Sequence, residues 1–334
     1  MVGEKRARFS VIVLGVFLIL QISLSVGVEY ISSSRTVPVA GHAGGKPRVA
    51  VVKPVFTATA YSSFYSFYTK YVNTLKDQII RSDLQLLNTT LVDSWGWSDG
   101  LRQFLSSDSA RANALVIGKN LTVLTDVSVD GGGLKYENGT RRFDVVILGF
   151  TEYVTSQEYS AYKHFVADGG RLIFMDATNF FAEVRFYPQT NHLALVKGHG
   201  WGFDGKKVWH DVRERWSQES TNWIASNFCC FGYGRRYDGA LPVGTNVISL
   251  SLQAKFGPKV FQSYKGHEEN RITNSSFTEI LAQWVQLDST SQNLVAAYSH
   301  RFMHGMVIHI GVMSSDVISF DRSVQFFLIR SVFS

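Results

Sequence analysis

Residues Phe143–Pro188, FDVVILGFTEYVTSQEYSAYKHFVADGGRLIFMDATNFFAEVRFYP, decide the fold of this chain. Val145–Phe150 is an apolar run with the length and β-branched content of a strand buried on both faces. Thr155-x-x-Glu158 is a capping box, which satisfies unpaired backbone N–H groups at a helix start, and Gly169-Gly170 supplies the left-handed stop. Leu172–Met175 follows as a second buried strand. The stretch therefore predicts a β-α-β unit, which is almost always parallel and right-handed.

Polar side chains follow both predicted strands. Glu152-Tyr153 come after the first strand, and Asp176 and Asn179 come after the second. Ligands of parallel sheets bind just beyond the carboxyl ends of the strands. We therefore take Glu152, Tyr153 and Asp176 as candidate catalytic residues and Asn179 as a candidate ligand-binding residue. Structural roles compete with this reading, since Asp often caps a following helix and Glu152 could pair with Arg185.

Strands and helices alternate along much of the chain, which predicts an α/β fold with a mostly parallel sheet and helices on both faces. The helix over 61–75 carries an aromatic stripe from Tyr61 onward, which we interpret as core packing. We expect His309 to point away from the core. The last helix, 317–331, should bury Phe320, Val324, Phe327 and Leu328. The other predicted strands are 48–56, 84–92, 114–117 or 121–124, 247–252, 294–299 and 306–312, and the other predicted helices are 99–106 and one over 277–285.

The pattern changes between about residues 188 and 245, where Gly, Trp, His and Asp crowd together. We predict that this segment is an insertion that folds over the carboxyl edge of the sheet, and we call it the cap. Its candidate ligand-binding residues are His199, Trp201, His210 and Asp211, although their spacing matches no compact zinc motif. Its tryptophans either pack in the core or stack on sugars; they are Trp201, Trp209, Trp216 and Trp223.

The amino terminus predicts export. Lys5, Arg6 and Arg8 precede Phe9–Val28, an uncharged stretch long enough to span a bilayer. The basic flank places the amino terminus inside and the rest of the chain outside the cell membrane. A cleaved signal peptide of a secreted protein is the alternative. The predicted organisation is thus an anchor or signal over 1–28, a linker over 29–46, and a domain over 47–334.

The net charge and the cysteine content limit which classes of partner we expect. The net charge of +6 is mild, and no dense Lys/Arg stripe supports nucleic-acid binding. The two cysteines are the neighbours Cys229 and Cys230, so a disulfide framework is absent. We expect an exported domain of this kind to contact the membrane through its N-terminal helix. A protein or glycan at the cell surface is its other expected partner. Four sequons are compatible with glycosylation, at Asn88, Asn120, Asn138 and Asn274.

The order of motifs in the central stretch resembles the class I glutamine amidotransferase-like fold, which has a flavodoxin-like sheet. A strand is followed by Gly149-Phe-x-Glu152-Tyr153-x-Thr155, a helix, Gly169-Gly-Arg-Leu-Ile-Phe174 and Asn179-Phe-Phe181. More narrowly, it resembles the C-terminal domain of the N,N-dimethylformamidase large (beta) subunit. Glu152-Tyr153 falls where that family carries a Pro-Glu-Tyr turn, and Asn179-Phe-Phe falls near its Asn-Gly-Phe-Tyr turn.

The resemblance argues against one chemistry and suggests another. A glutaminase needs a nucleophilic Cys at the turn after Leu172–Met175, where this chain has Asp176-Ala177-Thr178. Dimethylformamidase resembles a metal hydrolase in which two tyrosines and a glutamate hold iron. This implies iron or another divalent metal as the cofactor, and Tyr153 is the one position that aligns with a metal-ligand tyrosine.

Three hypotheses of function follow. The first is a membrane-anchored, extracytoplasmic amidotransferase-like domain without the Cys nucleophile, acting as a non-catalytic binding or assembly module. The second is a metal-dependent amide hydrolase, acting on C–N bonds, that uses Tyr153 together with Glu152 or Asp176. The third is a surface glycan-binding protein that uses the tryptophans of the cap.

Overall fold

The computed structural model describes residues 45–61, 87–88, 94–177, 179–198, 215–231, 237–261, 268–286, 295–311 and 313–334. The chain divides into two compact units, 1–38 and 39–334, and every described residue belongs to the second. The predicted anchor Phe9–Val28 lies outside the described residues. Within the ranges given above, no helix is long and apolar enough to cross a membrane.

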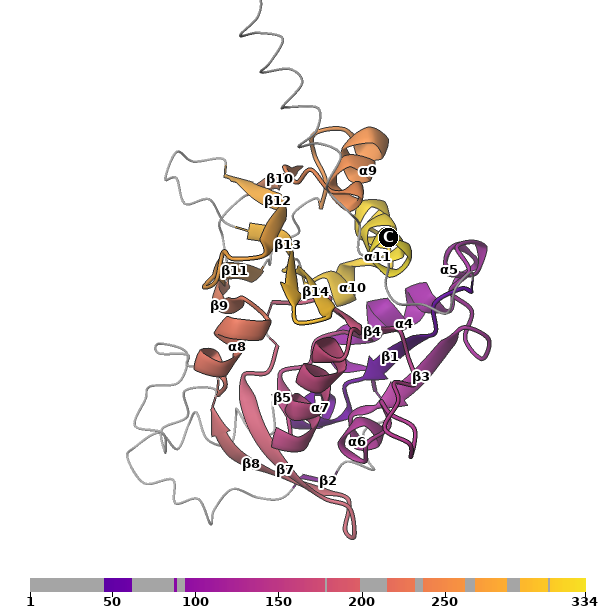
Figure 1. The fold of residues 1–334 in the computed structure, drawn as a ribbon, viewed down its shortest axis with the longest axis vertical. Coiled ribbons are helices and arrows are strands. Elements are labelled where there is room, and N and C mark those ends of the chain that lie inside the picture. The colour runs from indigo at the N-terminus through magenta and orange to yellow at the C-terminus, as the bar shows by residue number, and fades with distance from the viewer. Residues whose placement is uncertain are drawn as a thin grey trace, which may run out of the picture. The chain divides into compact units, whose positions relative to one another are not determined.

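The main sheet has a parallel and an antiparallel part (Figure 1). Its parallel strands lie in the order β3-β1-β4-β6-β14, and β13, β12 and β10 continue the sheet with antiparallel pairing. Two further strands, β11 and β9, branch from β13. The bounds are β1 Val49–Lys53, β3 Leu121–Thr125, β4 Val145–Leu148, β6 Arg171–Phe174, β9 Ser226–Phe231, β10 Tyr237–Pro242, β11 Glu268–Ile272, β12 Thr278–Gln286, β13 Val295–Phe302 and β14 Gly305–Ile310.

A second, smaller sheet has the order β2-β8-β7-β5. Its long β7–β8 hairpin is antiparallel, whereas β5 pairs with β7 in parallel. Its strands are β2 Leu87–Asn88, β5 Tyr153–Val154, β7 Ala182–Tyr187 and β8 His192–Gly198. The helices of the described residues are α2 Val55–Ala60, the 3-10 helix η3 Gly96–Ser98, α4 Asp99–Leu105, α5 Asp108–Ala112, α6 Asp126–Asp130, α7 Ser156–Ala167, α8 Ser217–Trp223, α9 Val247–Phe256, α10 Ser314–Val317 and α11 Arg322–Phe333.

The predicted β-α-β unit is present as β4, α7 and β6. The two strands are neighbours, parallel and fully buried, with Val145 opposite Arg171 and Leu148 opposite Phe174. Thr155 caps α7 by accepting the Glu158 N–H at 2.9 Å, as predicted. The second half of the capping box is wrong, because the Glu158 carboxylate turns inward and accepts from the Tyr162 hydroxyl at 2.7 Å.

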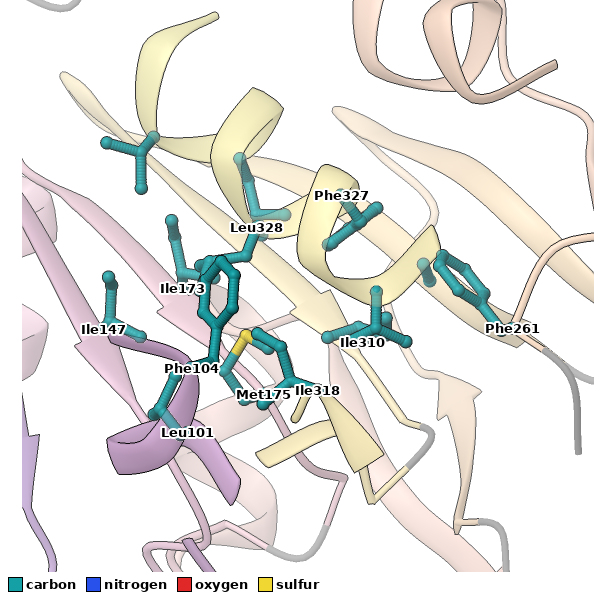
Figure 2. Packing of buried hydrophobic residues seen from close by; sticks show 14 of the residues in the cluster. Leu101, Phe104, Ile147, Ile173, Met175, Phe261, Ile310, Ile318, Phe327 and Leu328 are labelled. Atoms are coloured by element: carbon teal, nitrogen blue, oxygen red, sulfur yellow. The ribbon is translucent and has the colours of Figure 1, made fainter. Parts of the chain in front are cut away.

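Helices cover both faces of the sheet, as predicted. Alternate residues of β4 belong to different cores: Val145 and Ile147 face one, and Val146 and Leu148 face the other. Residues of α4, α9, α10 and α11 complete the first core. Figure 2 shows part of this core, with Phe104 of α4 next to Leu328 of α11. Residues of α6, α7 and α8 complete the second core. Each large side chain buried in this way stabilises the fold by about 1.5–3 kcal/mol.

Two of the predicted elements have the wrong type. Residues 247–252, predicted as a strand, form the first part of α9, because Asn246 caps the helix by accepting the N–H groups of Ile248 and Ser249. The predicted helix over 277–285 is instead strand β12. Register shifts between Ile280 and Gln283 interrupt its two-residue alternation, so that its apolar residues imitate helical spacing.

The predicted strand pair near the carboxyl terminus is confirmed as β13 and β14. The last helix, α11, begins later than predicted, since Asp321 caps it by accepting the N–H groups of Ser323 and Val324. Phe320 precedes this cap and is 54% exposed, so its predicted burial is wrong. Three other residues are buried as predicted: Val324, Phe327 and Leu328.

The cap segment contributes strands to both sheets. Its β8 pairs with β7, β9 pairs with β11, and β10 pairs with β12 in the main sheet. Residues 199–214 lie outside the described ones, so the predicted lid over the sheet edge remains a prediction. The cap tryptophans that the structure does describe, Trp216 and Trp223, are buried around Tyr159, with Trp216 stacked on its ring at 4.4 Å.

Candidate functional site

The candidate site lies where β1 and β4 end side by side. From β1 the parallel part of the sheet continues to β3 on one side and to β4, β6 and β14 on the other. Connections from neighbouring strands therefore diverge between β1 and β4, and such a switch point is where open α/β sheets place their ligands. Two segments meet there: α2 with Tyr61, after β1, and the turn Gly149–Glu152, after β4.

Thr57 joins these two segments. Its Oγ1 accepts the N–H groups of both Glu152 and Tyr153, each at 3.0 Å. Thr57, Glu152 and Tyr153 are all at most 2% exposed. The hydroxyl thus supplies an acceptor to two buried N–H groups, and it holds the turn after β4 against α2.

Three oxygen-bearing side chains converge at this junction: Tyr61, Glu152 and Tyr153. The Tyr61 hydroxyl donates a hydrogen bond to Glu152 Oε2. The rings of Tyr61 and Tyr153 meet edge to face with centroids 5.6 Å apart, and their side chains also hydrogen-bond. Residues 91 positions apart in the sequence thereby form one cluster of two phenols and a carboxylate.

The electrostatics of the cluster keep both phenols protonated. Burial, reinforced by the neighbouring Glu152 charge, raises the pKa of Tyr61 well above its usual value of 10. The same two causes, in the same order, raise the pKa of Tyr153 well above 10. Without a cation, the cluster therefore holds two neutral hydroxyl groups at neutral pH. A positive charge bound among these oxygens would favour loss of those protons.

Aromatic rings line the outer side of the cluster. Phe150 contacts Tyr61 with ring centroids 5.9 Å apart and contacts Trp97 at 6.1 Å. Trp97 is 39% exposed, so this wall reaches solvent. Ser98 fixes the wall, because its Oγ accepts the Phe150 N–H at 2.8 Å.

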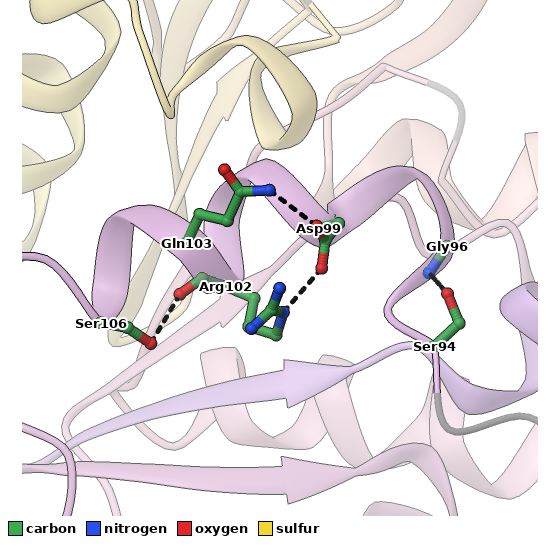
Figure 3. A network of polar contacts seen from close by, with 6 residues as sticks. All are labelled: Ser94, Gly96, Asp99, Arg102, Gln103 and Ser106. Atoms are coloured by element: carbon green, nitrogen blue, oxygen red, sulfur yellow. Dashed lines mark hydrogen bonds and ion pairs between the residues drawn. The ribbon is translucent and has the colours of Figure 1, made fainter.

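The segment carrying Trp97 is fixed by its own polar contacts, which Figure 3 shows. Asp99 accepts from Arg102 Nε at 2.6 Å and from Gln103 Nε2 at 2.8 Å, which stabilises the first turn of α4. Ser94 accepts the Gly96 N–H at 2.9 Å just before the turn. The aromatic wall therefore stands on an ordered element.

The other two candidates from the central stretch lie one strand further along. Asp176 follows β6 and is 1% exposed. Asn179 joins its turn to the turn after β4, because its side-chain oxygen accepts the Thr151 N–H at 3.2 Å while its Nδ2 donates to the Asp176 carbonyl oxygen. Asn179 thus has a structural contact that holds the two turns together. The catalytic role of Asp176 and the ligand-binding role of Asn179 stay predictions.

The cap candidates His199, Trp201, His210 and Asp211 lie outside the described residues, and so does Trp209. Among the residues that are described, no three His, Cys, Asp or Glu side chains group as a metal site would require. The glycan hypothesis loses support from Trp216 and Trp223, which are 4% and 0% exposed and have no free face for a sugar.

The prediction that His309 points away from the core is wrong. Its side chain is 2% exposed and lies between the rings of Phe174 and Tyr298, with centroids 5.1 and 5.2 Å away. Its neighbours along β14, Ile308 and Ile310, pack into the first core. His309 therefore lies on the opposite face of the sheet, which the second core covers. Burial lowers the pKa of His309 to about 3, so the imidazole is neutral.

Sequence reasoning missed Tyr61 as a site residue. Its place as the first member of an aromatic stripe predicts core packing instead. One signal was present, since Tyr61 follows the first predicted strand as Glu152 follows the central one. The sequence did not show, however, that these two strands are neighbours.

Comparison with known proteins supports the narrower of the two resemblances. The family described as N,N-dimethylformamidase beta subunit-like, C-terminal, matches residues 33–237, which include Tyr61, Glu152 and Tyr153. No curated protein matches the chain.

Several solved structures are similar at low identity. A ThuA-like protein from Bacteroides uniformis is 10% identical with a TM-score of 0.45, over 88% of this chain and 93% of that one. A beta-galactosidase from Halorubrum lacusprofundi is 14% identical with a TM-score of 0.43, over 86% of this chain and 30% of that one. A beta-galactosidase from Bacillus circulans is 10% identical with a TM-score of 0.44, over 85% and 30%. This chain thus spans under a third of the length of these galactosidases, and the similarities assign it no function.

The family match covers more than half of the 334 residues and contains the whole junction between β1 and β4. The chain therefore belongs to the N,N-dimethylformamidase beta subunit-like C-terminal family.

Proposed function

We propose that the protein is a metal-dependent hydrolase of amide C–N bonds, with Tyr61, Glu152 and Tyr153 as the metal-holding residues. The observation that carries the proposal is the convergence of two phenols and one carboxylate at the β1–β4 junction. This is the donor set that the family resemblance implies, two tyrosines and a glutamate. The position of Tyr61 supplies the second tyrosine.

The donor set fits a hard metal ion. Phenolate and carboxylate oxygens are hard ligands, which suit iron in its Lewis-acid role better than soft thiolate-preferring metals. When bound there, such an ion would supply polarisation of a carbonyl oxygen and a lowered pKa for water. The raised pKa values of the two tyrosines add a condition: ligation has to release phenol protons, so affinity should rise with pH.

The chain's own residues would orient the substrate and handle its protons. Glu152 already accepts a hydrogen bond from the Tyr61 hydroxyl, so the pair is arranged to hold a proton beside the reacting bond. Thr57 fixes the backbone of Glu152 and Tyr153. The rings of Phe150 and Trp97 offer an apolar wall for the N-alkyl part of an amide, which favours N-substituted amides over primary ones.

The fold class and the location of the domain belong to the same proposal. Numbered among themselves, the five parallel strands have the order 2-1-3-4-5, the order of flavodoxin-like sheets, and this supports the amidotransferase-like assignment. The apolar Phe9–Val28 stretch with its basic flank supports a membrane-anchored, extracytoplasmic domain.

The test combines metal content with activity on the full chain in detergent. Protein loaded with ferrous iron is expected to retain about one iron per chain and to release amine from N-alkyl formamides. Tyr61→Phe, Tyr153→Phe and Glu152→Gln should each lower iron affinity by about tenfold or more. Tyr159→Phe is the matched control, since its buried hydroxyl contacts Ser220 and Trp223 in the second core instead.

A protein that binds neither iron, zinc nor manganese stoichiometrically and hydrolyses no amide would overturn the hydrolase proposal. That result would leave the non-catalytic binding or assembly module as the function to test next. If iron binds and the three variants bind it as tightly as the wild type, the metal is held elsewhere and the assignment of the ligands is wrong.

A further inference from the structure

A pair of buried carboxyl groups lies at the N-terminal end of α2. Asp126, the first residue of α6, and Glu158, in the first turn of α7, are both 0% exposed. Asp126 Oδ2 accepts the Phe56 N–H at 2.7 Å, and Glu158 Oε1 accepts from the Tyr162 hydroxyl at 2.7 Å. The candidate site uses neither residue.

The remaining oxygen of each carboxyl group implies a shared proton. Asp126 Oδ1 and Glu158 Oε2 are buried and accept no hydrogen bond from the donors that the structure describes. The two side chains interact with one another. Two ionised carboxylates in one dry space repel, whereas one proton held between these oxygens satisfies both.

Helix α2 depends on this pair because it lacks an N-terminal cap of its own. It is preceded by Pro54, whose side chain offers no acceptor, and all six of its residues are buried. Asp126 supplies the missing acceptor from a different element. At the other end, Tyr61 follows α2 and reaches Glu152, and Thr57 within it holds the N–H groups of Glu152 and Tyr153.

We propose that Asp126 and Glu158 are positioning residues, whose shared proton holds α2 in place and thereby keeps Tyr61 and Thr57 against Glu152 and Tyr153. This inference rests on the proposed function, because the cluster that the two carboxyl groups position is the proposed metal site. The geometry of that cluster then depends on a proton bound elsewhere. The structural part of the inference concerns the metal-free protein and can be tested without metal.

The pair makes the arrangement sensitive to pH. Burial is the largest cause that raises the pKa of Asp126, to about 8, and burial followed by the Asp126 charge raises the pKa of Glu158 well above its usual range. The titratable groups that face the pair are Asp130 of α6 and Tyr162 of α7, while α2 carries none. As the pH rises through about 8, Asp126 ionises first and the pair keeps one proton, which Glu158 donates to Asp126. That shared proton is lost only as the pH rises further, through the raised pKa of Glu158, and the two repelling charges then loosen the contact with Phe56.

Hydrogen exchange of the metal-free full chain tests the proposal. We expect protection factors of peptides covering α2 and the Gly149–Glu152 turn to fall about tenfold or more between about pH 8 and about pH 11. Peptides from β6 serve as the internal reference and should stay protected. Asp126→Asn keeps an acceptor for Phe56 and gains a donor toward Glu158, so its protection should not depend on pH.

Two further variants sharpen the test. Glu158→Gln should also remove the pH dependence, because its amide replaces the shared proton. Asp130→Asn should keep the transition but move it to lower pH, because the Asp130 charge is one of the causes that raise both pKa values. Constant protection of wild-type α2 over this range, or a fall in Asp126→Asn equal to that of the wild type, overturns the proposal. Both results stand whether or not iron binds.

Discussion

Replacing His309 with Phe should remove a defined part of the acid sensitivity of this protein. His309 is packed between Phe174 and Tyr298, and burial lowers its pKa from 6.5 to about 3. The unfolded chain binds a proton at this residue below about pH 6.5, whereas the folded chain does not until about pH 3. The resulting stability is complete above about pH 6.5 and is lost as the pH falls toward about 3.

The size of the effect follows from the shift. The difference of about 3.5 pH units between 6.5 and about 3 corresponds to about 5 kcal/mol over the whole window. Between about pH 7 and about pH 5 the loss due to this residue is about 2 kcal/mol. Phe keeps an aromatic ring between the two neighbours but cannot be protonated. Overpacking by the larger ring lowers its stability at every pH by about 1–3 kcal/mol.

Urea unfolding followed by Trp fluorescence at both pH values measures the difference. Between about pH 7 and about pH 5, we expect the free energy of unfolding of the wild type to fall by about 2 kcal/mol more than that of His309→Phe. Other titrating groups contribute equally to both proteins and cancel. His164→Gln, at an exposed position of α7, keeps His309 in place and serves as the matched control. Equal losses in wild type and His309→Phe would refute the assignment of a buried neutral imidazole.

Three further predictions follow from close contacts and exposure. A Cβ on Gly100 would collide with the backbone carbonyl of Asp316, so Gly100→Ala should lower the melting temperature by forcing α4 and α10 apart; an unchanged melting temperature would contradict this packing. Phe327→Ala should cost about 3–5 kcal/mol in chemical unfolding, whereas Phe320→Ala at an exposed position should change it by about 0.5 kcal/mol or less. If the domain passes through a glycosylating export route, mass spectrometry should find sugar on Asn138, which is exposed in a turn, and none on Asn120, whose Nδ2 is buried.

The local pattern of the central stretch was enough to predict its unit. Val145–Leu148 and Leu172–Phe174 are so apolar that only a doubly covered sheet can bury them, and Thr155 marks the helix between them by its capping hydroxyl. The placement of Glu152, Tyr153 and Asp176 at strand ends followed from the same reasoning. Propensity failed where tertiary contacts dominate, as in the bulged strand β12 and the capped helix α9.

The sequence by itself therefore determined the parallel β-α-β unit, the edge of the sheet where polar groups gather, and the absence of a cysteine from the turn after β6. Only the tertiary structure decided that Tyr61 joins Glu152, because strand order is set by which apolar faces pack together over the whole domain and not by spacing along the chain. The same holds for Asp126 and Glu158, which share a proton only because α2, α6 and α7 exclude water from between them. The short-range sequence pattern predicts individual strands and helices, whereas long-range packing brings their functional groups together.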